Sequence, residues 1–141
     1  MVGLADFLRL SEWTFFAPTD EAFEKLFETS EPGRLTPESM TDLLLFHVVE
    51  DRTIPFEALQ CDKWLKMSND GFTVTHCRGF DKYQIGRGNG MTGGSGSGED
   101  GVSAVFSLQA SPIILQEDVR ACNGIIHSID TVLLPPAWLS A

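Results

Sequence analysis

Residues 14–23 read Thr-Phe-Phe-Ala-Pro-Thr-Asp-Glu-Ala-Phe, and this stretch contains a strand, its end and the beginning of a helix. The aromatic residues within 13–17 are typical of a short buried strand, which Pro18 ends. Thr19 or Asp20 then caps a helix, because a side-chain oxygen there accepts from the unpaired amides of the first turn. Apolar side chains follow at helical spacing: Ala22, Phe23, Leu26 and Phe27. The stretch predicts a buried strand that leads directly into an amphipathic helix.

A second helix and several strands are predicted further along the chain. The helix opens at Thr36–Pro37–Glu38, and its buried face comprises Met40, Leu43, Leu44 and His47. Asn69–Asp70–Gly71 is a strong signal for a hairpin turn. The predicted strands are 63–67, 72–75, 83–85, 102–108, 113–115 and 125–129, the last continuing to residue 134. Because the helices come first and the strands later, the pattern favours an α+β fold with a mainly antiparallel sheet.

Length and composition indicate one folded domain, which we place at residues 4–138. The chain has 141 residues with 43% hydrophobic residues, and its ten Phe and three Trp exclude disorder throughout. A formal net charge of −10 disfavours a nucleic-acid partner, which requires clustered Lys and Arg. No apolar run approaches the roughly 20 residues of a transmembrane helix. The first residues do not form a signal peptide, so the chain is either cytosolic or lacks its secretory segment here.

Residues 86–101 are rich in glycine and serine, which predicts a flexible insertion. Gly86, Gly88 and Gly90 invite comparison with a dinucleotide-binding loop, but Met91 stands where that motif needs a third glycine before a helix. We expect a plain loop and no cofactor.

The cysteines and histidines leave alternatives open. Folding the hairpin about residues 69–71 brings Cys61 and Cys77 nearly opposite one another, which would allow a cross-strand disulfide; two separate thiols are the alternative. Cys122 would remain unpaired. The histidines lack the short, regular spacing of metal ligands, so we expect no metal site and interpret His47 and His127 as buried, hydrogen-bonded side chains.

Three segments of the chain closely resemble the fasciclin domain family. Residues 14–23 resemble the family's first box, usually written TVFAPTNEAF, and residues 123–135 resemble its second box, NGVIHVID…VLLP. Residues 43–49 resemble the intervening Tyr-His segment, with Phe46 in place of the tyrosine. Residues 83–86 and 121–124 are similar to fasciclin-like proteins of algae and diatoms. The box residues, which we expect to be core, are Thr14, Phe16, Ala17, Pro18, Thr19, Phe23, Asn123, Gly124, His127 and Asp130.

This resemblance implies a wedge-shaped α+β domain, with antiparallel β-sandwich-like sheets and several short helices in the N-terminal half. It also implies a non-enzymatic role outside the cell or at its surface, in adhesion or matrix attachment. The partner would be a protein or matrix component, such as an integrin-like receptor or a second fasciclin domain. The family's adhesion motifs correspond here to Asp118–Val119 and to Phe46–His47. Asp118 capping a turn with Val119 in the core is the structural alternative.

The sequence departs from the family pattern in two ways, and two other functions are alternatives to adhesion. Helices usually precede the first box, so the chain is expected to be truncated at its N-terminus, with an exposed apolar patch. Phe46 lacks the hydroxyl that a tyrosine would offer at a binding surface. The alternative functions are a small-ligand or hydrolytic domain with a cleft near His47 and His127, and a purely structural domain of a larger surface protein.

Overall fold

The computed structural model describes residues 11–30, 33, 36–86, 89, 112–121 and 123–135. The described elements are β1 (Trp13–Pro18), α2 (Asp20–Thr29), α3 (Pro37–Leu45), β2 (Val48–Glu50), the 3-10 turn η2 (Phe56–Ala58), β3 (Trp64–Lys66), β4 (Phe72–Arg78), β5 (Asp81–Gly86), β6 (Ile114–Ala121) and β7 (Gly124–Ile129). The α+β fold class and the short helices of the N-terminal half are confirmed. The predicted strand 102–108, nearly all of the Gly/Ser-rich segment, Cys122 and both domain ends lie outside the described residues.

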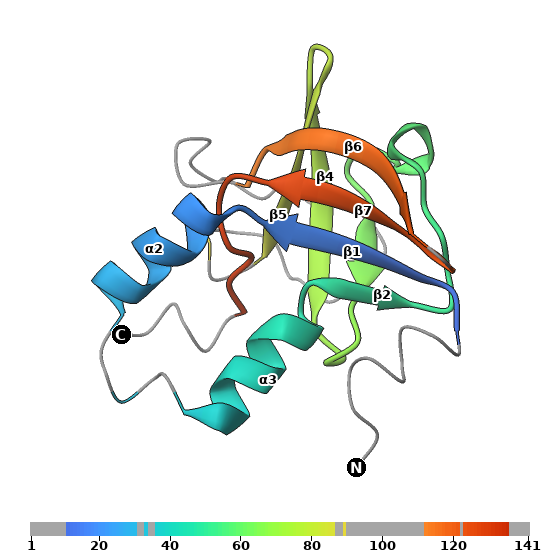
Figure 1. Ribbon diagram of the computed structural model, residues 1–141. Coiled ribbons are helices and arrows are strands. Elements are labelled where there is room, and N and C mark those ends of the chain that lie inside the picture. The colour runs from blue at the N-terminus through green and yellow to red at the C-terminus, as the bar shows by residue number, and fades with distance from the viewer. Residues whose placement is uncertain are drawn as a thin grey trace.

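Both helices begin as their sequences predict. The Thr19 side chain accepts a hydrogen bond from the Ala22 amide at the start of α2, while Asp20 and Glu21 in its first turn suit the positive end of the helix dipole. Thr36 and Ser39 form a reciprocal capping box at the start of α3. The helices α2 and α3 lie toward the end of the four-stranded sheet to which β1 and β7 point (Figure 1).

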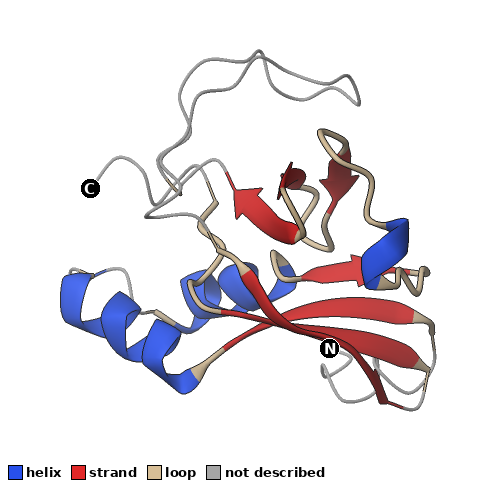
Figure 2. Ribbon diagram, turned by 90° about the horizontal axis from the view of Figure 1, so that it is seen from above, coloured by secondary structure: helices blue, strands red, loops and turns tan. Residues whose placement is uncertain are grey.

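The strands form two sheets, of order β2-β1-β7-β6 and β3-β4-β5. Figure 1 shows β4 and β5 passing behind the four-stranded sheet and crossing it, and Figure 2 shows the two sheets as separate layers. Among the described strands, every neighbouring pair is antiparallel except one: β1 pairs with β7 in parallel, with Trp13 opposite Gly124 and Pro18 opposite Ile129. The parallel pair is compatible with the mainly antiparallel arrangement that the sequence predicts. A parallel pair arises because the elements that lie between β1 and β7 in the sequence return the chain to the side on which β1 began.

Apolar side chains from the four-stranded sheet and from the segments that connect the elements form the main core, and Leu65 of β3 packs against it. This core contains Phe16, Phe46, Val49, Ile54, Leu59, Met67, Ile114, Ile129 and Leu133. A smaller cluster of Ala22, Leu26, Leu43 and Val132 attaches the helices to the segment that follows β7. Gly124 leaves room for the buried indole of Trp13 on the neighbouring strand β1, because a Cβ atom at position 124 would clash with that ring.

The last strand is shorter than predicted. β7 ends at Ile129 because the Asp130 carboxylate accepts from the Ile113 amide at 3.0 Å and from the Thr131 hydroxyl at 3.0 Å, which turns the chain. Beyond this turn, the Leu133 amide donates to Nε2 of His47 at 2.9 Å. Residues 132–134 therefore pack beside α3 rather than extending the sheet.

Candidate functional site

Asp118 lies where β6 departs from regular pairing with β7. The register between the two strands shifts between Gln116 and Val119, and Asp118 itself has a φ of 58°. Few residues other than glycine adopt this left-handed conformation, and Asp and Asn are the side chains that tolerate it best. The irregular backbone turns the Asp118 amide toward Nδ1 of His127, at 3.2 Å, while the carboxylate lies at the surface.

The Asp118 carboxylate holds the start of the turn η2, and the Lys82 ammonium spans the turn from Phe56 to Leu59. Oδ1 of Asp118 accepts from the Phe56 amide at 2.8 Å. Nζ of Lys82 donates to the carbonyls of Phe56 at 2.6 Å and Leu59 at 2.8 Å, and it lies 4.6 Å from the centre of the Phe56 ring. We call Phe56, Lys82, Asp118 and the half-buried Val119 the Asp118 surface. Three separate parts of the chain build it.

His127 supports this surface from below. The ring is fully buried, 5.7 Å from that of Phe16, and its Nε2–H donates to the Ile54 carbonyl at 2.8 Å. Because Nδ1 accepts from the Asp118 amide, this pattern requires the neutral ring with its proton on Nε2. One histidine therefore fixes the backbone both of Asp118 and of the segment that leads into η2.

Phe46 and His47 are buried, which corrects the prediction that they contact a partner. Both side chains have no exposed surface. Phe46 packs so closely that a Cβ atom on Gly86 would stand 2.6 Å from its ring. In place of a binding hydroxyl, position 46 has an aromatic ring that fills the core.

His47 connects α3 to the segment after β7. Its Nδ1–H donates to the Leu43 carbonyl at 2.7 Å, and its Nε2 accepts from the Leu133 amide. Burial lowers the pKa of His47 from 6.5 to about 4, although the hydrogen bond to Leu43 opposes this shift. His47 is therefore a neutral structural side chain at pH 7.

The box residues are buried or half-buried and position backbone, except that Asn123 is exposed and therefore not core as predicted. The buried Thr14 hydroxyl donates to the Arg52 carbonyl at 2.8 Å and accepts from the Ile54 amide at 2.8 Å. Thr14 and His127 thus hold the segment between β2 and η2 from two sides. The remaining box residues form β1 (Phe16, Ala17 and Pro18), cap or pack α2 (Thr19 and Phe23), or shape the ends of β7 (Asn123, Gly124 and Asp130).

Neither the metal nor the hydrolytic alternative gains support from this geometry. Within the described ranges, no group of three His, Cys, Asp or Glu side chains is arranged to hold a metal ion. His47 and His127 are too deeply buried to line a catalytic cleft.

Cys61 and Cys77 form a disulfide, with a distance of 5.5 Å between their Cα atoms. No helix in the described part of the chain has the length and apolar character needed to span a membrane.

The family resemblance pointed to Asp118 but not to the residues that surround it. Phe56 and Lys82 reach Asp118 only through contacts between segments distant in sequence. The hairpin signal at residues 69–71 indicates which residues of β3 and β4 face each other, but it does not place β5 or what lies beside the hairpin. Asn89 was also missed: its buried amide binds Gly86, Val132 and Leu134, so it holds the segment after β7 rather than a phosphate.

These positions and the two-layer arrangement define an α+β domain in which a threonine of the first strand and a histidine of the last strand organise the interior. The chain belongs to the Fasciclin domain family, whose model matches residues 1–135. A solved FAS1 domain pair from the insect cell adhesion molecule fasciclin I has the same fold. It matches with a TM-score of 0.54 and 19% identity over 92% of this chain and 39% of that chain.

Curated relatives come from bacteria, animals and plants. Immunogenic protein MPB70 of Mycobacterium bovis is 27% identical over 137 residues, which are 96% of this chain and 56% of the relative. Transforming growth factor-beta-induced protein ig-h3 of Sus scrofa is 30% identical over 88% of this chain and 15% of its own length. Fasciclin-like arabinogalactan protein 17 of Arabidopsis thaliana is 26% identical over 86% of this chain and 23% of its own length. The chain thus spans little more than half of the first relative and less of the others.

Proposed function

We propose that this chain is a non-enzymatic interaction module that acts in cell adhesion or matrix attachment, outside the cell or at its surface. The Asp118 surface would contact a protein or matrix partner, either an integrin-like receptor or a second fasciclin domain. Support comes from the family, since one similar structure is from a cell adhesion molecule and one relative is named a cell surface glycolipoprotein.

The position of the Asp118 carboxylate is the observation that carries this proposal. The carboxylate is exposed, yet the Phe56 amide and the backbone hydrogen bond to His127 fix it in place. An ionised carboxylate has about four acceptor sites, so the one used by Phe56 leaves capacity for a partner. The half-buried Val119 adds apolar area beside the charge. A pre-positioned charge next to apolar surface favours specific recognition, because little side-chain freedom is lost on binding.

Asp118→Asn tests this proposal more sharply than Asp118→Ala. Asparagine tolerates the left-handed backbone and still accepts from the Phe56 amide, so only the negative charge is lost. We expect binding to fall about tenfold or more. The measurement is attachment of cultured cells to plates coated with the variant, or self-association in analytical ultracentrifugation if the partner is a second copy. The thermal unfolding midpoint should not change.

Glu24→Gln is the matched control, since Glu24 is an exposed carboxylate on α2, away from the Asp118 surface. This variant should attach and associate like the unmodified protein. If folded Asp118→Asn retains full attachment and full self-association, the proposal is wrong. A loss shared equally by Glu24→Gln would point to the net charge instead and would also contradict it.

A further inference from the structure

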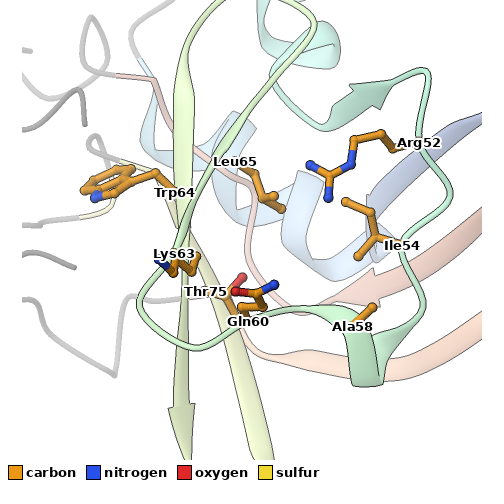
Figure 3. A pocket seen from close by; sticks show the side chains of 8 residues that line it. All are labelled: Arg52, Ile54, Ala58, Gln60, Lys63, Trp64, Leu65 and Thr75. Carbon is orange, nitrogen blue, oxygen red and sulfur yellow. The ribbon is translucent and has the colours of Figure 1, made fainter. Parts of the chain in front are cut away.

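A pocket lies between the segment that follows β2 and the segment that leads into β3 (Figure 3). Its volume is about 220 Å³. Arg52, Ile54 and Ala58 form one wall, and Gln60, Lys63 and Leu65 contribute to the other. In Figure 3 the side chains of Arg52 and Ile54 project toward that of Leu65 across the pocket. The space therefore combines two cations and an amide with apolar surface.

Both walls are held by the interior of the domain. Thr14 binds the Arg52 carbonyl and the Ile54 amide, and His127 binds the Ile54 carbonyl. On the opposite wall, the Cys61–Cys77 disulfide connects the segment to β4. The Asp62 amide donates to the Thr75 carbonyl at 2.6 Å, and the Thr75 amide donates to the Lys63 carbonyl at 3.3 Å. The pocket is thus formed before any ligand arrives, which lowers the entropic cost of binding.

The charge of the pocket is opposite to that of the whole chain. Two of the ten Lys and Arg residues line it, whereas no Asp or Glu among the described residues does, in a chain with a net charge of −10. Asp51 and Asp62 immediately precede the two cations, but they adopt φ values of 62° and 63°. This left-handed geometry changes the chain direction between each acid and the base that follows it. Arg52 and Lys63 form no ion pair within the described part of the chain.

We propose that this pocket binds a small carboxylate that also bears hydroxyl groups, such as a hydroxy acid or the acidic ring of a sugar. The planar guanidinium of Arg52 suits a carboxylate, with which it can form two parallel hydrogen bonds. The Gln60 amide offers both a donor and an acceptor for hydroxyls. Ile54, Ala58 and Leu65 offer apolar contact to the carbon face of a ring. The volume is smaller than that of sites for drug-sized ligands, so the pocket takes one ring or its equivalent.

Isothermal titration calorimetry with three probes tests the proposal. Sodium glucuronate supplies the carboxylate and hydroxyls on one free ring, a galacturonate trimer supplies the same chemistry within a polysaccharide, and glucose supplies hydroxyls alone. We expect both acids to bind, more weakly as NaCl is raised, and glucose not to bind. Tighter binding of the trimer would indicate a polysaccharide source, and equal or tighter binding of glucuronate would indicate a free acid.

Three variants locate the binding. Arg52→Gln should weaken glucuronate or trimer binding about tenfold or more, because it removes a charge-assisted hydrogen bond. Arg78→Gln removes the same charge from an exposed position at the end of β4, outside the pocket, and should leave affinity unchanged. Ala58→Trp fills the pocket without changing charge and should abolish binding. Circular dichroism verifies the fold of each variant.

Four results would overturn the proposal. They are the absence of heat with either acid up to roughly 10 mM, an equal loss in Arg78→Gln, full binding by folded Ala58→Trp, and binding of pentaglutamate in place of both sugar acids. The last would assign the pocket to an acidic peptide. Asp118→Asn should bind the acids normally, so failure here and failure of the proposed adhesion surface are distinguishable.

Discussion

His47 and His127 are both buried, and the hydrogen bonds of each require a neutral ring. In each case one ring nitrogen donates to a backbone carbonyl while the other accepts from a backbone amide, and one of the two partners is distant in sequence. The sequence indicated burial because both residues occur among apolar neighbours. It could not indicate the partners, because Leu133 and Ile54 meet the rings only through the fold.

The lowered pKa of His47 makes the stability of the domain depend on pH. The unfolded chain binds a proton near pH 6.5, whereas folded His47 binds it only near pH 4. Between these values the unfolded state holds more protons, so stability is fully present above pH 6.5 and falls as the pH decreases toward 4. The loss should approach about 3 kcal/mol.

His47→Gln checks this dependence, with urea denaturation at pH 7.5 and pH 4.5 as the measurement. The substitution should cost more free energy of unfolding at pH 7.5 than at pH 4.5, because the histidine has lost most of its contribution at the lower pH. His76→Gln, at a partly exposed position, serves as the control. An equal cost of His47→Gln at both pH values would contradict the prediction.

Helices and hairpins were predictable because their signals are local. Thr19 and Thr36 cap the two helices within three residues of themselves, and residues 69–71 connect β3 to β4 where the turn signal stands. The two strands that local patterns did not reveal are β2 and most of β6. β2 has only three residues and directly follows the end of α3. β6 has exposed polar side chains through its centre, and its irregular register disrupts the alternation by which strands are recognised.

The disulfide joins the segment before β3 to the end of β4, across 16 residues of sequence. Closing a loop of this size should stabilise the domain by about 3 kcal/mol, because it restricts the unfolded chain. We expect the double variant Cys61→Ser/Cys77→Ser to lower the free energy of unfolding in urea by that amount. Under strong reduction the unmodified protein should fall to the same value, and a double variant as stable as the oxidised protein would exclude this role.

In the whole molecule, β1 is the strand on which the rest of its sheet depends. It lies between β2 and β7, and its Phe16 amide also donates to the His47 carbonyl at 2.9 Å. The sequence indicated that the residues of the first and last boxes are core, but it could not reveal that their strands pair in parallel. The direction of pairing depends on every element between the two strands. The contact of Phe56 with Lys82 and the approach of the two pocket walls likewise depend on the whole fold.

Native-state hydrogen exchange tests the central position of β1. Release of β1 requires separation from both β2 and β7, so its amides should exchange only through global unfolding. β3 is short and lies at an edge of the other sheet, so its amides should exchange through smaller openings. Mass spectrometry of peptides covering 13–18 and 64–66 would measure both rates, and equal protection in the two peptides would contradict this order.

The parallel pairing of β1 with β7 also has a consequence for synthesis on the ribosome. β1 is translated near the start of the sequence, but the strand that completes its hydrogen bonding emerges only after almost all the other elements. A nascent chain therefore carries an aromatic strand with one unpaired edge for most of its translation, and contacts so distant in sequence form slowly. Protection of that edge by a chaperone would matter more for this domain than for a helical bundle of the same length.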